Sequence, residues 1–195
     1  NVVISKFGKM LRRTLRENIT ISMNLVPSIG AVLADERQLE QVLLNLAVNA
    51  QDAIPGSGLL VIATKDVSVD ADFAEARPGL APGRYVVITV SDNGTGMDSE
   101  TLSRIFEPFF TTKESGRGTG LGLAMVYGII KQHKGYVDVM SEPGVGTTFS
   151  LYLPVTAESM DRVQVAERAG IQKGTETILL VEDDDAVRFT VRQLL

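Results

Sequence analysis

Five residues with carboxamide or carboxylate side chains recur at spacings of three and four within residues 35–54. They are Gln38, Gln41, Asn45, Asn49 and Asp52. On a helix this spacing places them in one stripe, although mid-helix asparagine is roughly a few tenths of a kcal/mol less favourable than alanine. Two interpretations are open. A solvated polar face is the one we favour for Gln38 and Gln41, whereas Asn49 is also suited to bind a hard cation such as Mg²⁺ through its amide oxygen.

A carboxylate followed by alternating glycines stands at residues 92–97, Asp-Asn-Gly-Thr-Gly-Met. After a strand, glycines such as Gly94 and Gly96 let the backbone approach a flat ligand closely. The Asp92 carboxylate can then accept a hydrogen bond from an amino group of that ligand. The alternative is an ordinary turn that begins with Asp-Asn.

A second glycine-rich segment, residues 116–123, reads Gly-Arg-Gly-Thr-Gly-Leu-Gly-Leu and leads into a helical pattern. Free backbone N–H groups and a positive dipole end are the physical requirements of a phosphate site. The dipole contributes only about 0.3–1 kcal/mol per charge at an exposed site. A polyphosphate therefore needs further cations, which Lys113, Arg117 and a bound Mg²⁺ could supply. The spacing fits neither the dinucleotide-binding fingerprint nor the P-loop.

Three phenylalanines, Phe106, Phe109 and Phe110, lie between the two glycine-rich segments. Phenylalanines in a globular protein are commonly core residues. The sequence around these three is polar and rich in glycine, and offers little regular structure for them to pack on. We therefore favour an aromatic anchor that holds a mobile lid.

The elements that position these residues follow from hydrophobic periodicity and from capping and turn residues. Helices are expected at 7–17, 35–54 and 121–132; the second has Asp35 as its N-cap with Gln38 as capping-box partner, and Gly135 closes the third. Strands, which we expect to pair antiparallel, are predicted at 19–25, 59–69, 84–91, 136–140 and 147–153. This order predicts an α+β sandwich over residues 1–154, a linker over 155–176, and the start of a new α/β unit at 177–195.

Composition narrows the classes of function. The chain has 195 residues, 44% of them hydrophobic, and a net charge of −5, which allows one large domain or one domain plus a fragment and does not favour nucleic-acid binding. It has no cysteine and one histidine, His133, which excludes thiolate chemistry and multi-histidine metal sites. No signal peptide or long apolar run is evident, so we expect a cytoplasmic protein. The pattern is cut at both ends, and we expect a piece of a longer protein.

Taken in order, five motifs resemble those of the catalytic ATP-binding domain of bacterial sensor histidine kinases, in the Bergerat-fold superfamily with gyrase, Hsp90 and MutL. Residues 45–50 resemble the N box, 92–96 the G1 box, 106–110 the F box, 118–123 the G2 box and 146–149 the strand motif that follows. The resemblance covers residues 1–154. It implies a two-layer α/β sandwich in which ATP binds between the helical layer and a flexible lid.

The resemblance also implies roles for the matching residues. Asp92 would bind the adenine amino group with Thr147 nearby, Asn49 would ligate Mg²⁺, and Asn45 would lie beside the phosphates. The other expected cofactor-binding residues are Gly94, Gly96, Lys113, Arg117, Gly118, Thr119, Gly120, Leu121 and Gly122. Hydrolysing relatives carry a glutamate at the position of Asn45. Because an amide is no general base at neutral pH, we expect slow hydrolysis and transfer of the γ-phosphoryl group to a protein.

A complete kinase of this family has a dimerising helical hairpin with a phosphoacceptor histidine followed by an acid. His133 lies in Lys-Gln-His-Lys-Gly and does not match, so we interpret it as a partner of a helix C-terminal dipole. We expect the acceptor upstream of Asn1, on a separate dimerisation domain. The fragment would then bind ATP without labelling itself, as a monomer cut from a homodimeric kinase.

Residues 178–188, Ile-Leu-Leu-Val-Glu-Asp-Asp-Asp-Ala-Val-Arg, resemble the first strand and helix of a response-regulator receiver domain. The resemblance implies that Glu182 and Asp183 are its Mg²⁺-binding pair and that the acceptor aspartate lies beyond Leu195. The alternative is an acidic turn that caps a helix. A receiver here would make the parent a hybrid histidine kinase whose relay partners are receiver or phosphotransfer domains.

Two other functions stay open. One is a superfamily ATPase of the DNA-topology or mismatch-repair kind, opposed by Asn45 and by the receiver-like tail. The other is a binding module such as an anti-sigma-type regulator, opposed by the intact Asn49, Asp92 and glycine loops. Neither alternative changes the expected pocket, only its use.

Overall fold

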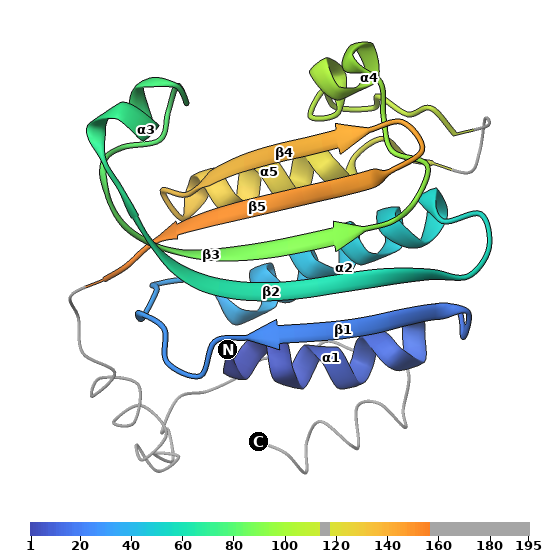
Figure 1. Ribbon diagram of the computed structural model, residues 1–195, viewed down its shortest axis with the longest axis horizontal. Coiled ribbons are helices and arrows are strands. Elements are labelled where there is room, and N and C mark those ends of the chain that lie inside the picture. The colour runs from blue at the N-terminus through green and yellow to red at the C-terminus, as the bar shows by residue number, and fades with distance from the viewer. Residues whose placement is uncertain (114–117, 157–195) are drawn as a thin grey trace, which may run out of the picture. The chain divides into compact units, whose positions relative to one another are not determined.

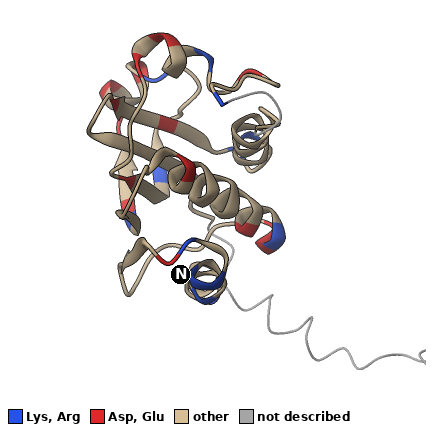
Figure 2. Cartoon of the chain, turned by 90° about the vertical axis from the view of Figure 1, so that its right-hand side faces the viewer, with Lys and Arg blue, Asp and Glu red and all other residues tan. Residues whose placement is uncertain are grey.

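The computed structural model describes residues 1–113 and 118–156. They form one five-stranded sheet with three long helices on the same face (Figures 1 and 2). The strand order is β1-β2-β3-β5-β4. The predicted α+β two-layer sandwich is confirmed for these residues, whereas Arg117, residues 157–176 of the predicted linker and the receiver-like segment 177–195 lie outside the described residues.

The strands are close to their predicted ranges: β1 is Ile19–Leu25, β2 Gly58–Val69, β3 Gly83–Asp92, β4 Tyr136–Glu142 and β5 Gly146–Pro154. All neighbouring pairs are antiparallel except β1 and β2, which are parallel, with Ile21 opposite Leu60. The expectation of antiparallel strands is therefore wrong for β1. The reason is that a helix crosses over between β1 and β2, as a parallel pair requires.

The long helices are α1 (Val2–Thr14), α2 (Glu36–Ala53) and α5 (Gly122–Gln132). Asp35 caps α2 as predicted, its side chain accepting a hydrogen bond from the backbone N–H of Gln38 at 3.0 Å. Two short helices, α3 (Ala71–Glu75) and α4 (Ser99–Arg104), were not predicted. Their side-chain caps, Asp70 and Asp98, are visible in the sequence, but helices this short carry no periodic pattern.

The end of α5 differs from the prediction. Lys134, not Gly135, takes the left-handed conformation, with φ +55°. The backbone N–H of Gly135 bonds to the carbonyl of Ile130 at 2.8 Å, and a Cβ on Gly135 would lie 2.5 Å from the carbonyl oxygen of Tyr152. Glycine is therefore required at 135 for the close approach of β5.

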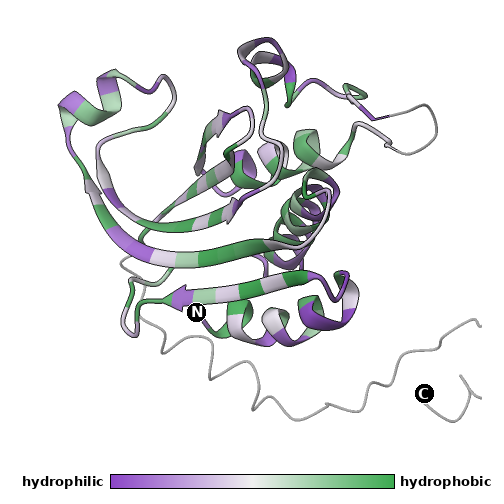
Figure 3. Ribbon diagram, turned by 45° about the vertical axis from the view of Figure 1, so that its right-hand side comes forward, coloured by the Kyte–Doolittle hydropathy of each residue, from purple (hydrophilic) through white to green (hydrophobic). Residues whose placement is uncertain are grey.

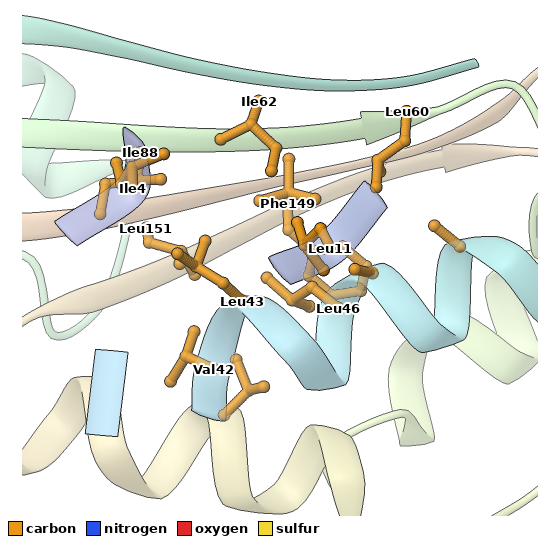
Figure 4. Close-up of a cluster of buried hydrophobic side chains, with 14 of the residues drawn as sticks. Ile4, Leu11, Val42, Leu43, Leu46, Leu60, Ile62, Ile88, Phe149 and Leu151 are labelled. Carbon is orange, nitrogen blue, oxygen red and sulfur yellow. The ribbon is translucent and has the colours of Figure 1, made fainter. Parts of the chain in front are cut away.

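The main core fills the space between the sheet and the helices (Figure 4). Leu43 and Leu46 of α2 point toward the sheet and Val42 toward α5 (Figure 4), and all three are at most 1% exposed, as are Leu60 and Ile62 of β2. Burying each such side chain stabilises the fold by about 1.5–3 kcal/mol relative to full exposure. Figure 3 shows these hydrophobic segments along the strands and the long helices. α2 is thus held rigidly on the sheet with its polar stripe beside the core.

A second, smaller core covers the other face of the sheet beneath α3. Its members are Val69, Ala74, Leu80, Tyr85, Val87 and Tyr152. Residues 85–88 of β3 are consequently buried in succession instead of alternating, as expected of a strand covered on both faces. This fixes the position of β3, which ends at Asp92.

The chain continues past β5 in contact with the domain. Val155 forms an isolated antiparallel bridge with Val32, and the backbone N–H of Thr156 bonds to the carbonyl of Ala31 at 2.8 Å. Residues 155 and 156, predicted to begin a linker, are therefore paired with the fold. Among the described helices, none has the length and apolar character that crossing a membrane requires.

Candidate functional site

The polar stripe of α2 lies against α5, and the two helices run antiparallel. Asp35 contacts His133 at one end, Gln41 contacts Met125 in the middle, and Asn45 contacts Gly122 at the other end. We call this contact the α2–α5 seam. It brings the N-terminus of α5 to the asparagines of α2.

Gly122 stands directly opposite both asparagines. The Asn45 side-chain amide reaches the carbonyl of Gly122 at 3.4 Å. A Cβ on Gly122 would lie 3.9 Å from Oδ1 of Asn45 and 3.9 Å from Nδ2 of Asn49. Leu121, the N-cap of α5, makes no side-chain cap hydrogen bond. The first turn of α5 therefore directs backbone N–H groups and a positive dipole end beside the amide pair.

The glycine loop before α5 is pinned to the phenylalanine segment. Gly120 has φ +65°, and a Cβ there would lie 2.3 Å from the carbonyl carbon of Phe109. The Phe109 N–H bonds to the Gly120 carbonyl at 2.9 Å. Thr119 Oγ1 accepts a weak hydrogen bond from the Leu121 N–H at 3.4 Å. Only glycine fits this approach at position 120.

The three phenylalanines behave differently from one another. Phe106 packs on the core, its ring centroid 5.1 Å from that of Tyr127. Arg104 lies over the ring of Phe110 at 4.4 Å. Phe109 is 74% exposed with φ +69°. The predicted aromatic anchor therefore fits Phe106 and is wrong for Phe109, which ties the loop through its backbone instead.

Asp92 lies at the end of β3, opposite Thr147 of β5. Its Oδ1 accepts a hydrogen bond from the Gly94 N–H at 2.8 Å. Burial raises the pKa of Asp92, while backbone hydrogen bonds from Gly94 and Thr147 partly offset that rise. The result is a half-buried carboxylate whose remaining acceptor capacity is available to a ligand donor.

Gly94 and Gly96 carry the chain between the end of α2 and the β4–β5 turn. The Thr95 N–H bonds to the Ala53 carbonyl at 2.8 Å, and a Cβ on Gly94 would lie 2.7 Å from that oxygen. Gly96 has φ +64°, and its Cβ would lie 2.0 Å from the carbonyl of Glu142. An ordinary turn needs neither approach, so these glycines serve a tightly packed loop.

Ser141 of β4 is a site residue that sequence reasoning missed. Its Oγ accepts a hydrogen bond from the Met97 N–H at 2.8 Å and lies 2.8 Å from Oγ1 of Thr147. Thr147 is itself buried. Ser141 therefore joins residues 92–97 to β5, and no motif marks it because its role depends on the register of β4 with β5.

Lys113 pairs with Asp52, the last residue of the α2 stripe, with Nζ 2.5 Å from Oδ2. Its stem runs beside the glycine loop, since a Cβ on Gly118 would lie 3.2 Å from Cδ of Lys113. Both side chains of the pair are about a third or more exposed. Such a pair contributes about 0–1 kcal/mol, so an anion could draw Lys113 away from Asp52.

The two glutamines of the stripe, Gln38 and Gln41, differ in their exposure to solvent. Gln41 is exposed, with Nε2 2.7 Å from Sδ of Met125. The prediction of a solvated side chain is wrong for Gln38, whose Oε1 is buried without a hydrogen-bond partner. Across the described ranges, no group of three or more His, Cys, Asp or Glu could hold a metal ion. A hard cation at Asn49 would accordingly take further ligands from water and phosphate oxygens.

This geometry, a half-buried carboxylate at one end and a glycine loop with paired amides at the other, agrees with the family comparison. Residues 34–157 match the family described as histidine kinase-, DNA gyrase B-, and HSP90-like ATPase. That range exceeds half of the chain. The chain therefore belongs to this ATPase family.

Within the family, its relatives are sensor kinases. It is 44% identical over 195 residues to the sensor kinase CckA of Brucella abortus (strain 2308), covering 95% of this chain and 20% of that protein. The catalytic domain of histidine kinase ThkA matches with TM-score 0.63 and 28% identity, over 80% of this chain and 92% of that one. Full-length ShkA in complex with AMPPNP matches with TM-score 0.63 and 29% identity, and the match covers 80% of this chain and 30% of that one.

The chain thus spans about a fifth of the length of the curated relative named above. It corresponds to the ATP-binding catalytic domain of sensor histidine kinases.

Proposed function

We propose that the chain binds Mg²⁺-ATP at the α2–α5 seam and residues 92–97, and that it passes the γ-phosphoryl group to a histidine on a separate dimerisation domain of a hybrid kinase. One observation carries the proposal. Gly122, at the free N-terminus of α5, faces Asn45 and Asn49 of α2. Positive backbone groups and a cation ligand therefore meet at one point, as a polyphosphate requires.

The adenine end of the pocket would be at Asp92. Its carboxylate accepts the adenine amino hydrogen, and the hydroxyl pair of Ser141 and Thr147 holds the adjoining backbone in place. Gly94 and Gly96 let the loop that follows Asp92 pack closely on the backbone at Ala53 and Glu142, which fixes the chain around the carboxylate. Selection of adenine would thus rest on one donor–acceptor pair at a carboxylate whose backbone is held in place.

The phosphate end would be formed by Asn49 and by the segment from Gly118 to Gly122, including Thr119, Gly120 and Leu121. The Asn49 amide oxygen would hold Mg²⁺, which neutralises phosphate charge when bound. The N–H groups of the first α5 turn orient the phosphate oxygens. Lys113, released from Asp52, adds a charge, and Arg117 is proposed as a second cation from the sequence alone.

Asn45 is the residue that favours phosphoryl transfer over hydrolysis. It lies at the site, with its amide 3.4 Å from the Gly122 carbonyl, where a general base would activate water. An amide does not accept a proton at neutral pH. ATP would be retained for a protein acceptor, which argues against a DNA-topology or repair ATPase.

The tail supports the hybrid form of the proposal. The alignment with the sensor kinase CckA covers 95% of the chain, and so extends beyond the ATPase family match, which ends at residue 157. We propose that the linker is residues 157–176, since 155 and 156 pair with the fold, and that 177–195 is the start of a receiver, with Glu182 and Asp183 as its Mg²⁺ ligands. Receiver or phosphotransfer domains would be relay partners, and the relay would operate in the cytoplasm, where ATP is available.

Trans-phosphorylation tests the proposal. The chain is mixed with the separately purified dimerisation hairpin of the parent protein and γ-labelled ATP, and acid-labile label on the hairpin is measured. Label should appear on the hairpin, depend on Mg²⁺, and be absent from the chain incubated alone. Rapid ATP hydrolysis without hairpin, abolished by Asn45→Ala, would contradict the proposal.

A further inference from the structure

The single imidazole of the chain joins the two helices of the site at the end remote from the nucleotide. Nδ1 of His133 lies 2.8 Å from the carbonyl of Ile129, and the backbone N–H of Asp35 lies 3.1 Å from Nε2. A carbonyl can only accept and an amide N–H can only donate. Nδ1 must therefore carry the proton while Nε2 accepts, which defines a neutral imidazole of one tautomer.

This contact lies between two helix ends. His133 is the C-cap of α5 and Asp35 is the N-cap of α2. The Ile129 carbonyl is among the C-terminal carbonyls of α5, and the Asp35 N–H precedes the first turn of α2. His133 thus does more than the dipole partner expected from the sequence, because it binds the neighbouring helix as well as its own.

The part of α2 and the part of α5 that lie between the His133 contact and the proposed nucleotide site have nearly the same length. From Asp35 to Asn45 along α2, and from His133 to Gly122 along α5, the axial distances are about 15 and 17 Å at about 1.5 Å per residue. Because the helices run antiparallel, fixing one end of the α2–α5 seam sets which residue of α2 faces Gly122 at the other. Among the polar contacts between those ends, that of Gln41 with the thioether of Met125 is adaptable, because thioethers tolerate several packings.

We infer that His133 is a positioning residue for the nucleotide site: its neutral imidazole sets the register of the α2–α5 seam, and so holds Gly122 opposite Asn45 and Asn49. The inference rests on the proposed function. Without the hydrogen bond between His133 and Asp35, α5 can shift along α2. Only a fraction of the protein molecules then has the phosphate site in its binding geometry. The apparent affinity for Mg²⁺-ATP falls in proportion to that fraction.

Two substitutions at His133 separate positioning from simple structural support. His133→Asn retains a donor where Nδ1 lies and loses the acceptor for Asp35. His133→Gln extends its amide oxygen to the position of Nε2 and retains that acceptor. Loss of one neutral hydrogen bond corresponds to about a threefold to tenfold change. We expect His133→Asn to weaken Mg²⁺-ATP binding by that factor in titration calorimetry, and His133→Gln to bind like the wild type.

A second pair of variants removes the partner instead of the imidazole. Asp35 has φ −73°, which a proline ring accommodates, and proline has no N–H to donate. Asp35→Gly loses the same side-chain cap but retains the N–H. Asp35→Pro should bind Mg²⁺-ATP about threefold to tenfold more weakly than Asp35→Gly. Adding His133→Asn to Asp35→Pro should weaken binding no further.

Because the chain has one histidine, nitrogen NMR of the untagged, histidine-labelled 195-residue chain reads this imidazole alone. We expect the Nδ1–H tautomer. Equal affinity in His133→Asn and His133→Gln, equal affinity in Asp35→Pro and Asp35→Gly, or an Nε2–H tautomer would each overturn the inference. A wild-type chain that shows the Nδ1–H tautomer but binds no Mg²⁺-ATP would instead overturn the proposed function.

Discussion

Gly122 and Asn49 face one another across the α2–α5 seam, with 3.9 Å between the position of a Cβ on Gly122 and Nδ2 of Asn49. They belong to motifs far apart in the sequence: Gly122 begins α5, and Asn49 lies near the end of α2. Their approach joins the free N–H groups of a helix to an amide that can hold a cation. The proposed nucleotide site rests on this contact.

Replacing Gly122 with alanine tests what that contact is for. The new Cβ would make ordinary contacts at 3.9 Å, so the chain should fold, but the methyl group would occupy the space of the phosphates. We expect at least a tenfold loss of Mg²⁺-ATP affinity in calorimetry. Gly128→Ala is the matched control in the same helix, with open space around its Cβ, and should stabilise the chain by about 0.5–1 kcal/mol without affecting affinity. Equal effects of both would argue against a phosphate site at Gly122.

Gly96 should tolerate no side chain. Its φ of +64° and the carbonyl of Glu142, 2.0 Å from a Cβ, penalise alanine through both backbone conformation and contact with another backbone. Gly96→Ala should lower the free energy of unfolding by at least about 1–2 kcal/mol, measured by urea denaturation. Gly56→Ala, with nothing within 4 Å of its Cβ, should change it far less. A stable Gly96→Ala chain would show that residues 92–97 repack easily.

Asp92 makes stability depend on pH in a definite direction. Burial raises its pKa in the folded chain, so the carboxylate is harder to ionise there than in the unfolded chain. The folded state is favoured by protonation of Asp92, and this stabilisation is lost as pH rises through the folded pKa. Asp92→Asn should therefore raise the thermal unfolding temperature of the nucleotide-free chain at neutral pH, and the gain should shrink in acid. If the difference in unfolding temperature between Asp92→Asn and the wild type grew in acid, the pKa of Asp92 would not be raised in the folded chain.

Lys113 and Asp52 form an exposed pair, which should matter more for the nucleotide than for folding. Lys113→Ala should change the free energy of unfolding by less than about 1 kcal/mol, yet weaken ATP binding severalfold and reduce its dependence on salt. Asp52→Asn frees the ammonium group and should strengthen ATP binding modestly. If both variants bind ATP like the wild type at low salt, Lys113 does not reach the phosphates.

The sequence predicts those parts of the fold that depend on local pattern. The apolar face of α2 and its Asp35 cap, the alternation of β1, and the glycine segments all appear where periodicity and turn chemistry indicate. Helices α3 and α4 were missed because five and six residues are too few for a period to show. The parallel pairing of β1 with β2 could not be predicted from the strand itself, since it depends on where the crossover helix returns the chain.

The site shows the same division. Asn45, Asn49, Asp92 and the glycines stand out as candidates in the sequence because their residue types are unusual in their elements. Ser141 could not, because a serine in a strand becomes a site residue only through the register of β4 with β5. Gln38 was assigned to solvent because nothing in α2 alone shows that its Oε1 becomes buried. The role of Ser141 and the burial of Gln38 both depend on neighbours from other elements of the fold.

The central claim is that one pocket binds ATP through Asp92 and its magnesium through Asn49. Calorimetric titration of ATP into the wild-type chain, Asp92→Ala and Asn49→Ala, each with and without Mg²⁺, tests it most directly. The wild type should bind only weakly without Mg²⁺, Asp92→Ala should lose at least tenfold in affinity under both conditions, and Asn49→Ala should lose the response to Mg²⁺. Unchanged affinity and unchanged Mg²⁺ dependence in both variants would contradict the account.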